Sequence, residues 1–208
     1  MLTGINAAVM KADTPTDNEL VRLISGGDRE AFAELYRRRQ ANVYRFALQM
    51  SGRPELAEDV TQEVFMVLMR GDAGYDEARG SVKAFLLGVA RNYVLRRLKQ
   101  DHYFVSVEEH EDLSYGEAGG HLATLTRKAT IESVRKAVLS LPEHYREVIA
   151  LCELQEMSYG ETAQVLGCAI GTVRSRLHRA RAMLLEKLHP ARNEDVATPE
   201  VKSARCFA

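Results

Sequence analysis

The hydrophobic residues of this chain recur at steps of three and four positions, and no stretch alternates with a period of two. Such spacing is typical of helices that bury one face, so it predicts helices rather than strands. The broadest stripe follows Asp28 and consists of Phe32, Leu35, Tyr36, Val43, Phe46, Ala47 and Met50. The pattern therefore predicts an all-α fold.

Start and stop signals divide the first half of the chain. Thr16 and Glu19 form a capping box, in which each side chain can bond a backbone amide at the start of a helix. Gly52 can end a second helix, and Pro54 suits the first turn of a third. These signals predict helices over residues 16–25, 29–51 and 54–68, then a glycine-rich loop over 71–81 and a fourth helix over 82–100.

The two halves are separated by an acidic stretch. Residues 101–126 hold six Asp or Glu and no Lys or Arg, and no helical period is visible up to Gly120. This composition predicts a solvated linker between two small helical domains. The predicted units are a flexible N-terminus (1–15), a first domain (16–100), a flexible acidic linker (101–121), a second domain (122–189) and a disordered tail (190–208).

The second domain contains a predicted helix-turn-helix. Ser158 and Glu161 form another capping box, Gly167 offers a turn, and a basic helix runs from about Gly171 to Leu188. One side of that helix carries Val173, Leu177, Ala180 and Leu184, and the other carries Ser175, His178 and Arg179, flanked by Arg174, Arg176 and Arg181. Arginine can bind guanine edges or phosphates. A solvated arginine-rich surface is the alternative, but the order of caps, turn and basic helix favours DNA recognition.

Composition limits the other functions. With 28 basic and 29 acidic residues, contact with DNA must be local, and residues 80–100 hold five Lys or Arg without an acid. Three cysteines without metal-ligand spacing predict a reduced, cytoplasmic protein with no metal or cofactor. The chain contains no run of eighteen apolar residues, so membrane insertion is not expected. It also contains no phosphate-binding loop, HExxH or nucleophile motif, so no catalytic residues and no enzymatic activity are expected.

Residues 141–188 resemble region four of bacterial RNA polymerase sigma factors of the extracytoplasmic-function (ECF) type. Their sequence is LPEHYREVIALCELQEMSYGETAQVLGCAIGTVRSRLHRARAMLLEKL, in which GTVRSRLHRAR is the most specific part. The resemblance implies that the basic helix binds the minus-thirty-five promoter element. The residues that it implies are Thr172, Arg174, Ser175, Arg176, His178 and Arg179.

The first half is similar to region two of the same family. The matching segments are DNELVRLISGGDREAFAELYRRRQANVYRFAL, at residues 17–48, and AEDVTQEVFMVL, at residues 57–68. This similarity implies that Asp59, Gln62, Glu63 and Phe65 contact the beta-prime clamp helices of core RNA polymerase. For the charges alone, a solvated helix start that compensates the helix dipole is an equal alternative, and Phe65 could instead be a core residue.

The fourth helix and its preceding loop correspond to the part of the family that binds the minus-ten element. Holding unpaired bases calls for a pocket, planar surfaces and positive charge. The residues implied are Tyr75, Arg79, Lys83, Phe85, Asn92, Arg96 and Lys99, with further charge from Arg91 and Arg97. Tyr75 could instead anchor the loop. Phe85 replaces a common tryptophan and Arg96 a common polar residue, so no promoter consensus is assigned.

Two matching modules in the expected order predict a sigma factor that directs promoter-specific initiation. Its implied partners are promoter DNA, the beta-prime clamp helices and beta flap of core polymerase, and an anti-sigma protein. The alternative is a free-standing helix-turn-helix regulator, which leaves the DVTQEVF segment and the basic fourth helix unexplained. Cys206 could sense oxidation, although a dispensable tail is favoured because no second thiol is positioned to resolve an oxidised one.

Overall fold

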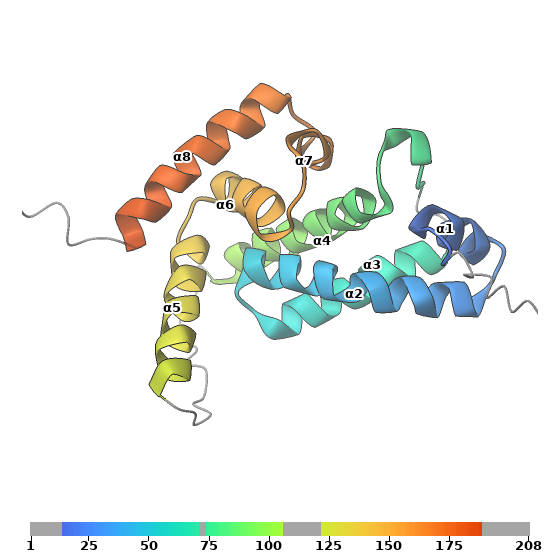
Figure 1. Cartoon of the computed structure of the whole chain (residues 1–208), viewed down its shortest axis with the longest axis horizontal. Coiled ribbons are helices and arrows are strands. Elements are labelled where there is room, and N and C mark those ends of the chain that lie inside the picture. Colours follow the sequence, from blue (N-terminus) through green and yellow to red (C-terminus); the bar gives the residue numbers. More distant parts are fainter. Residues whose placement is uncertain (1–13, 71–73, 106–121, 189–208) are drawn as a thin grey trace, which may run out of the picture.

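The computed structural model describes residues 14–70, 74–105 and 122–188, and no strand occurs in these ranges. Helices α1 (Asp17–Ser25), α2 (Arg29–Ser51), α3 (Pro54–Met69) and α4 (Val82–Val105) form one half of the molecule. The other half consists of α5 (Leu122–Leu139), α6 (Glu143–Ile149), α7 (Tyr159–Leu166) and α8 (Ile170–Leu188). Figure 1 shows α6 and α7 lying over α4, with α8 on the outside. The predicted all-α fold is confirmed.

The predicted caps set the helix ends. Thr16 and Glu19 form the capping box of α1, and the Asp28 carboxylate accepts hydrogen bonds from two backbone amides at the start of α2. Gly52 ends α2 in the left-handed conformation, and Pro54 opens α3. Helix α4 continues to Val105, five residues beyond the predicted end at Gln100 and into the stretch predicted as linker.

Two short elements were not predicted. The loop before α4 contains a single 3₁₀ turn, η1 (Glu77–Arg79), and α6 is followed by a π-helical turn, η2 (Ala150–Leu154). After η2, Glu156 adopts a positive φ of 53°, which is uncommon for a residue with a side chain. The π turn and this residue redirect the chain from α6 into α7.

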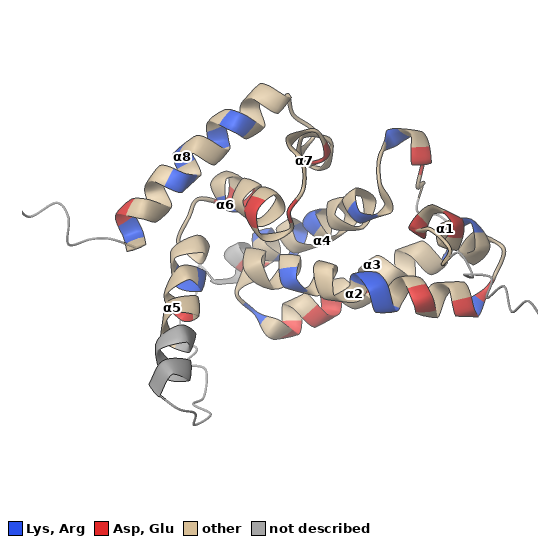
Figure 2. Ribbon diagram, in the orientation of Figure 1, with Lys and Arg blue, Asp and Glu red and all other residues tan. Residues whose placement is uncertain are grey.

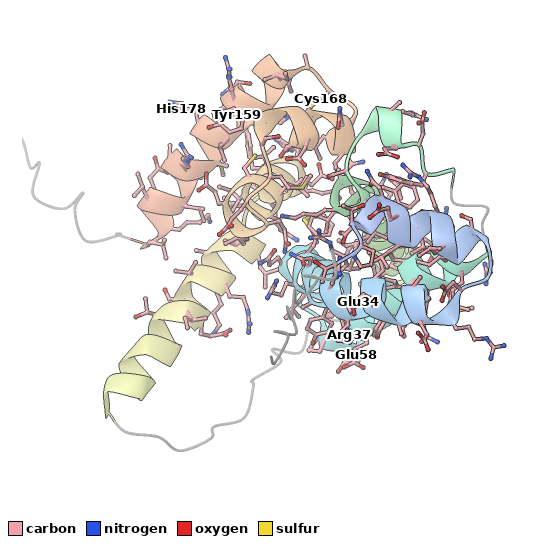
Figure 3. All side chains as sticks on the ribbon, turned by 45° about the vertical axis from the view of Figure 1, so that its right-hand side comes forward. Glu34, Arg37, Glu58, Tyr159, Cys168 and His178 are labelled. Atoms are coloured by element: carbon pink, nitrogen blue, oxygen red, sulfur yellow. The ribbon has the colours of Figure 1, made fainter. Side chains whose placement is uncertain are left out.

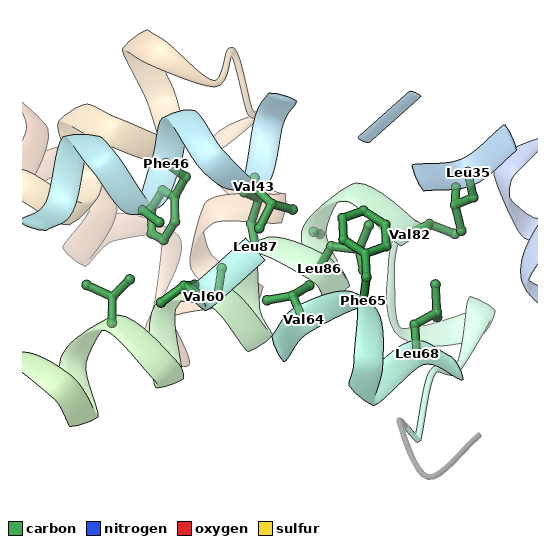
Figure 4. Packing of buried hydrophobic residues seen from close by; sticks show 14 of the residues in the cluster. Leu35, Val43, Phe46, Val60, Val64, Phe65, Leu68, Val82, Leu86 and Leu87 are labelled. Carbon is green, nitrogen blue, oxygen red and sulfur yellow. The ribbon is translucent and has the colours of Figure 1, made fainter. Parts of the chain in front are cut away.

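The larger of two hydrophobic cores lies where α1, α2, α3 and α4 meet. Figure 4 shows Val43 and Phe46 from α2, Val64 and Phe65 from α3, and Leu87 from α4 pointing into it. The smaller core is made by Val138, Leu141, Val148, Ile149, Leu177 and Ala180. The halves are not independent, because the larger core also contains Ala150, Leu151 and Met157 of the second half.

Polar contacts join the same two halves. Arg91 of α4 forms an ion pair with Glu147 of α6 at 2.6 Å, and the Glu147 side chain is only 3% exposed. The Asn42 amide donates to the Gln155 side chain at 3.1 Å. The Arg146 guanidinium, whose pKa is lowered by burial, donates to the Met50 carbonyl at 2.6 Å. The second half therefore packs on α2 and α4 through both apolar and charged groups.

Within the described residues, no helix has both the length and the apolar character needed to cross a membrane. The predicted tail with Cys206 lies outside the described residues, as do most of the flexible N-terminus and of the linker. The boundaries assigned to the two domains therefore stay a prediction.

Candidate nucleic-acid interface

Helices α7 and α8 form the predicted helix-turn-helix. The Ser158 and Glu161 capping box starts α7, and Gly167 ends it at φ 63°, a left-handed conformation that glycine adopts without a steric penalty. Helix α8 begins three residues later, at Ile170. Its residues Val173, Leu177 and Ala180 are buried as predicted, so the helix has a fixed inner face.

The outer face of α8 carries the polar residues that the sequence predicted to meet DNA. Arg174, Ser175, His178 and Arg179 are exposed, whereas Thr172 and Arg176 are half-buried at its edge. The Arg174 guanidinium lies 5.9 Å from the centre of the Tyr159 ring, and Ser175 donates to the Thr172 carbonyl. Figure 2 shows the basic residues spaced along α8, and Figure 3 shows His178 and Tyr159 on the same side of the molecule.

A cavity of about 400 Å³ lies between α4 and the loop before it. Four residues predicted to bind the minus-ten strand line it together: Tyr75, Arg79, Phe85 and Asn92. The lining includes Ala84, which has a small side chain, and Gly88, which has none, so the helix surface leaves room there. Gln164 and Val165 of α7 complete the lining, which the sequence did not predict.

Tyr75 acts as an anchor of the loop, the alternative that the sequence left open. Its ring packs edge-on against Phe85 with centroids 5.4 Å apart, and its hydroxyl donates to Asn18 at 2.6 Å. Burial, more than the nearby Glu77 carboxylate, raises the pKa of the phenol. The Tyr75 side chain is thus a neutral, fixed part of the cavity wall.

The remaining predicted residues of α4 lie outside this cavity. Lys83 donates to the Gln155 carbonyl of the second half. Arg96 is exposed, with its guanidinium 5.7 Å from the centre of the Tyr93 ring, and Lys99 is exposed one turn further on. The cations of α4 therefore divide into an early pair, Lys83 and Arg91, bonded to the second half, and a later group that faces solvent.

A second and larger hollow, of about 710 Å³, runs between α2 and α3. Aromatic rings of Phe32, Tyr36 and Tyr44 line it, together with Met66 and Met69, which are exposed. Tyr36 and Phe65 meet edge-on with centroids 4.7 Å apart. The sequence had assigned Phe32 and Tyr36 to the core stripe of α2, but Tyr36 is 36% exposed, so the predicted stripe extends beyond the buried core.

Of the four residues predicted to contact polymerase, Gln62 and Phe65 line this groove, whereas Asp59 and Glu63 do not. Asp59 is exposed and Glu63 is half-buried. Phe65 is 2% exposed, so it is a core residue whose ring only borders the groove, in agreement with the alternative stated for it. Figure 3 shows Glu58, another lining residue, on the side of the molecule away from His178.

Two family models match this chain. Residues 35–102 match "Sigma-70 region 2", and residues 131–184 match "Sigma-70, region 4". The first match covers the lining of the groove between α2 and α3 except Phe32, and the part of the cavity lining that comes from α4 and its preceding loop. The second covers α7 and α8 as far as residue 184.

Similar proteins match along most of their length. The ECF RNA polymerase sigma factor SigM of Mycobacterium tuberculosis (strain H37Rv) is 31% identical over 173 residues, covering 83% of this chain and 85% of that protein. SigE of Mycolicibacterium smegmatis, an ECF sigma factor, is 30% identical over 186 residues, covering 86% and 70%. Among solved structures, the sigma factor RpoE of Bartonella quintana, in complex with the anti-sigma factor NepR, superposes with a TM-score of 0.63 at 26% identity, covering 77% of this chain and 98% of that one.

Proposed function

This chain belongs to the ECF type of the sigma-70 family, and from that membership we propose which of its surfaces bind polymerase and promoter. It is a sigma factor, which binds core RNA polymerase and directs initiation at particular promoters. The observation that supports the proposal most strongly is the cavity at α4, where Tyr75, Phe85 and Asn92 line one space beside exposed cations.

The cavity suits an unpaired base of the minus-ten element. Phe85 provides an aromatic surface for stacking, and the Asn92 amide can both donate to and accept from a base edge. Arg79 lines the mouth of the same cavity, and Arg96 and Lys99 continue along α4, where they can follow the phosphates of the strand. We therefore assign melting and capture of the minus-ten strand to this region.

The outer face of α8 suits the major groove of the minus-thirty-five element. Arg174 and Arg179 are exposed there beside Ser175 and His178, and arginine binds guanine or phosphate with paired donors. Thr172 and Arg176 border this face. Because polymerase supplies a second point of attachment, this helix needs only a modest affinity of its own.

The groove between α2 and α3 suits a helical partner. Its aromatic and methionine side chains offer apolar contact area, and Glu58 and Gln62 add an acidic and an amide group to the lining. We infer that this groove receives the clamp helices of the beta-prime subunit, and that the second domain meets the beta flap.

We also infer control by an anti-sigma protein, because the similar sigma factor of Bartonella quintana was solved with one. The chain contributes specificity rather than chemistry of its own, and it acts in the cytoplasm, where its DNA lies.

Holoenzyme reconstituted with core polymerase tests these assignments. Asn92→Ala should reduce the rate of run-off transcription about tenfold, because a base held by the amide loses its hydrogen bonds. Gln100→Ala, an exposed residue on the same helix outside the cavity, is the matched control and should retain wild-type transcription. Failure to associate with core polymerase, together with promoter binding by the chain alone, would contradict the proposal.

A further inference from the structure

The loop that forms one wall of the α4 cavity is held by side chains of α1. The Asn18 amide oxygen accepts from the Tyr75 hydroxyl at 2.6 Å, and the Asn18 amide nitrogen donates to Glu77 at 2.7 Å. Arg22, one turn further along α1, donates to the other oxygen of Glu77 at 2.5 Å. Asn18 and Arg22 are separated from the loop by more than fifty residues of sequence.

Besides α1, the loop is held by the packing of Tyr75 on Phe85, by the Tyr75 hydroxyl, which also donates to the Gly80 carbonyl at 3.2 Å, and by Ser81, which donates to Glu161 of α7 at 3.0 Å. Its 3₁₀ turn spans only Glu77–Arg79 and buries no residue, and so short a turn is not stable by itself. Asp76 caps that turn locally, and Gly80 then leaves it at φ 148°, a conformation that side chains disfavour. The hydrogen bonds to α1 therefore add polar attachment points, at Tyr75 and Glu77, to a loop whose own turn is weak.

Asn18 is suited to this position by its chemistry. A single amide both accepts a hydrogen bond from Tyr75 and donates one to Glu77, which neither a carboxylate nor an apolar side chain can do. Hydrogen bonds from Arg22 and then Asn18 lower the pKa of the Glu77 carboxyl, so Glu77 is the charged acceptor at neutral pH. Asn18 thus bonds both Tyr75 and Glu77 of the loop, and Arg22 bonds Glu77 as well.

We propose that Asn18 and Arg22 are positioning residues for promoter melting, which hold the wall of the cavity in place before the minus-ten strand enters. Neither lines the cavity, so they act through Tyr75 and Glu77. A wall that is already ordered spares the strand the entropy of ordering it on capture. This inference rests on the proposed role of the cavity.

The test measures open complexes formed by holoenzyme, through the permanganate reactivity of unpaired thymines near the minus-ten element. Asn18→Asp keeps the acceptor for Tyr75 but places a carboxylate against Glu77, so it should reduce open complexes about tenfold. Arg22→Glu should reduce them about fivefold, because the pair is partly exposed. Adding Glu77→Arg to Arg22→Glu should recover part of this loss, since the swapped pair can reform although the Asn18 amide nitrogen loses its acceptor.

Controls separate positioning from general damage. Arg37→Glu reverses an exposed arginine that pairs with Glu34 on α2, far from the cavity, and should leave opening unchanged. Should Asn18→Asp not fold, Tyr75→Phe removes the hydroxyl from which Asn18 accepts, together with its weaker hydrogen bond to the Gly80 carbonyl, and should lower opening about threefold.

The outcomes are distinguishable. If Asn92→Ala impairs opening while Asn18→Asp opens promoters as wild type does, the positioning role is wrong and the cavity assignment stands. If the charge swap recovers none of the lost opening, the Arg22–Glu77 pair does not position the loop. If Asn92→Ala, Asn18→Asp and Tyr75→Phe all leave opening unchanged, the proposed role of the cavity fails together with this inference.

Discussion

The two helices proposed to meet promoter DNA differ in what their cations already contact. On α8, Arg174, Arg176 and Arg179 form no ion pair within the part of the chain that the structure describes. On α4, Lys83 and Arg91 are bonded to the second half of the molecule. The face of α8 is thus available as it stands, whereas the first turns of α4 must release internal partners before their cations can bind DNA.

This difference arises from packing between the halves. Leu151, from the π turn after α6, is fully buried in the core built by α1, α2, α3 and α4. Glu147 lies four residues earlier, in α6, and brings its carboxylate to Arg91. The apolar contact and the ion pair therefore hold the same two surfaces together.

The largest effect should come from removing the apolar contact. Leu151→Ala should lower the free energy of unfolding by about 3 kcal/mol, because it leaves a cavity in a core that both halves share. Urea denaturation measures this loss. Leu185→Ala, at a leucine of α8 that is 62% exposed, should change stability by less than about 0.5 kcal/mol. Similar losses for the two variants would show that the halves do not depend on this contact.

A smaller effect should follow from breaking the ion pair. Glu147→Ala should lower the free energy of unfolding by about 2 kcal/mol, below the cost of a fully buried pair because the Arg91 side chain is 22% exposed. The exposed pair of Arg181 with Glu153 should contribute less than about 0.5 kcal/mol. Double-mutant cycles on both pairs measure the two coupling energies. Equal values would show that the Arg91 pair between the halves is no stronger than the exposed Arg181 pair on α8.

The smallest effect concerns the free cations of α8. Arg179→Ala should weaken binding of holoenzyme to promoter DNA about fivefold and reduce the slope of log affinity against log salt by about one, as expected for a lost phosphate contact. Arg181→Ala should have less than half this effect, because Glu153 already neutralises that side chain. Titration at several salt concentrations measures both, and an unchanged slope for Arg179→Ala would argue against a phosphate contact there.

Local signals in the sequence were enough to place the helices. Thr16, Asp28 and Ser158 cap helices as predicted, and Gly52 and Gly167 end them, because caps depend on residues close in the chain. The π turn after α6 had no such signal. It depends on packing against α2 and α4, which periodicity within one segment does not contain.

In the candidate site too, contacts between residues close in sequence were predicted and contacts between distant elements were missed. Phe85 and Asn92 share a cavity with Tyr75 as the family resemblance implied, because two turns of one helix and its preceding loop hold them. Asn18 and Gln164 were missed, since each reaches the loop from an element distant in sequence. Lys83 was assigned to DNA, but its present partner, the Gln155 carbonyl, belongs to the other half.

Gly88, which lines the cavity, lies within helix α4. A glycine within a helix costs about 1 kcal/mol relative to alanine, and a Cβ added at this position would meet nothing within 4 Å. Alanine would therefore make α4 more stable, yet it would also take up space where a base is proposed to sit. With Gly88, helix α4 is thus less stable than it would be with alanine, and the missing Cβ leaves room for the strand proposed to bind there. A protein selected for stability alone would be expected to lose this glycine, and with it part of its hold on the promoter.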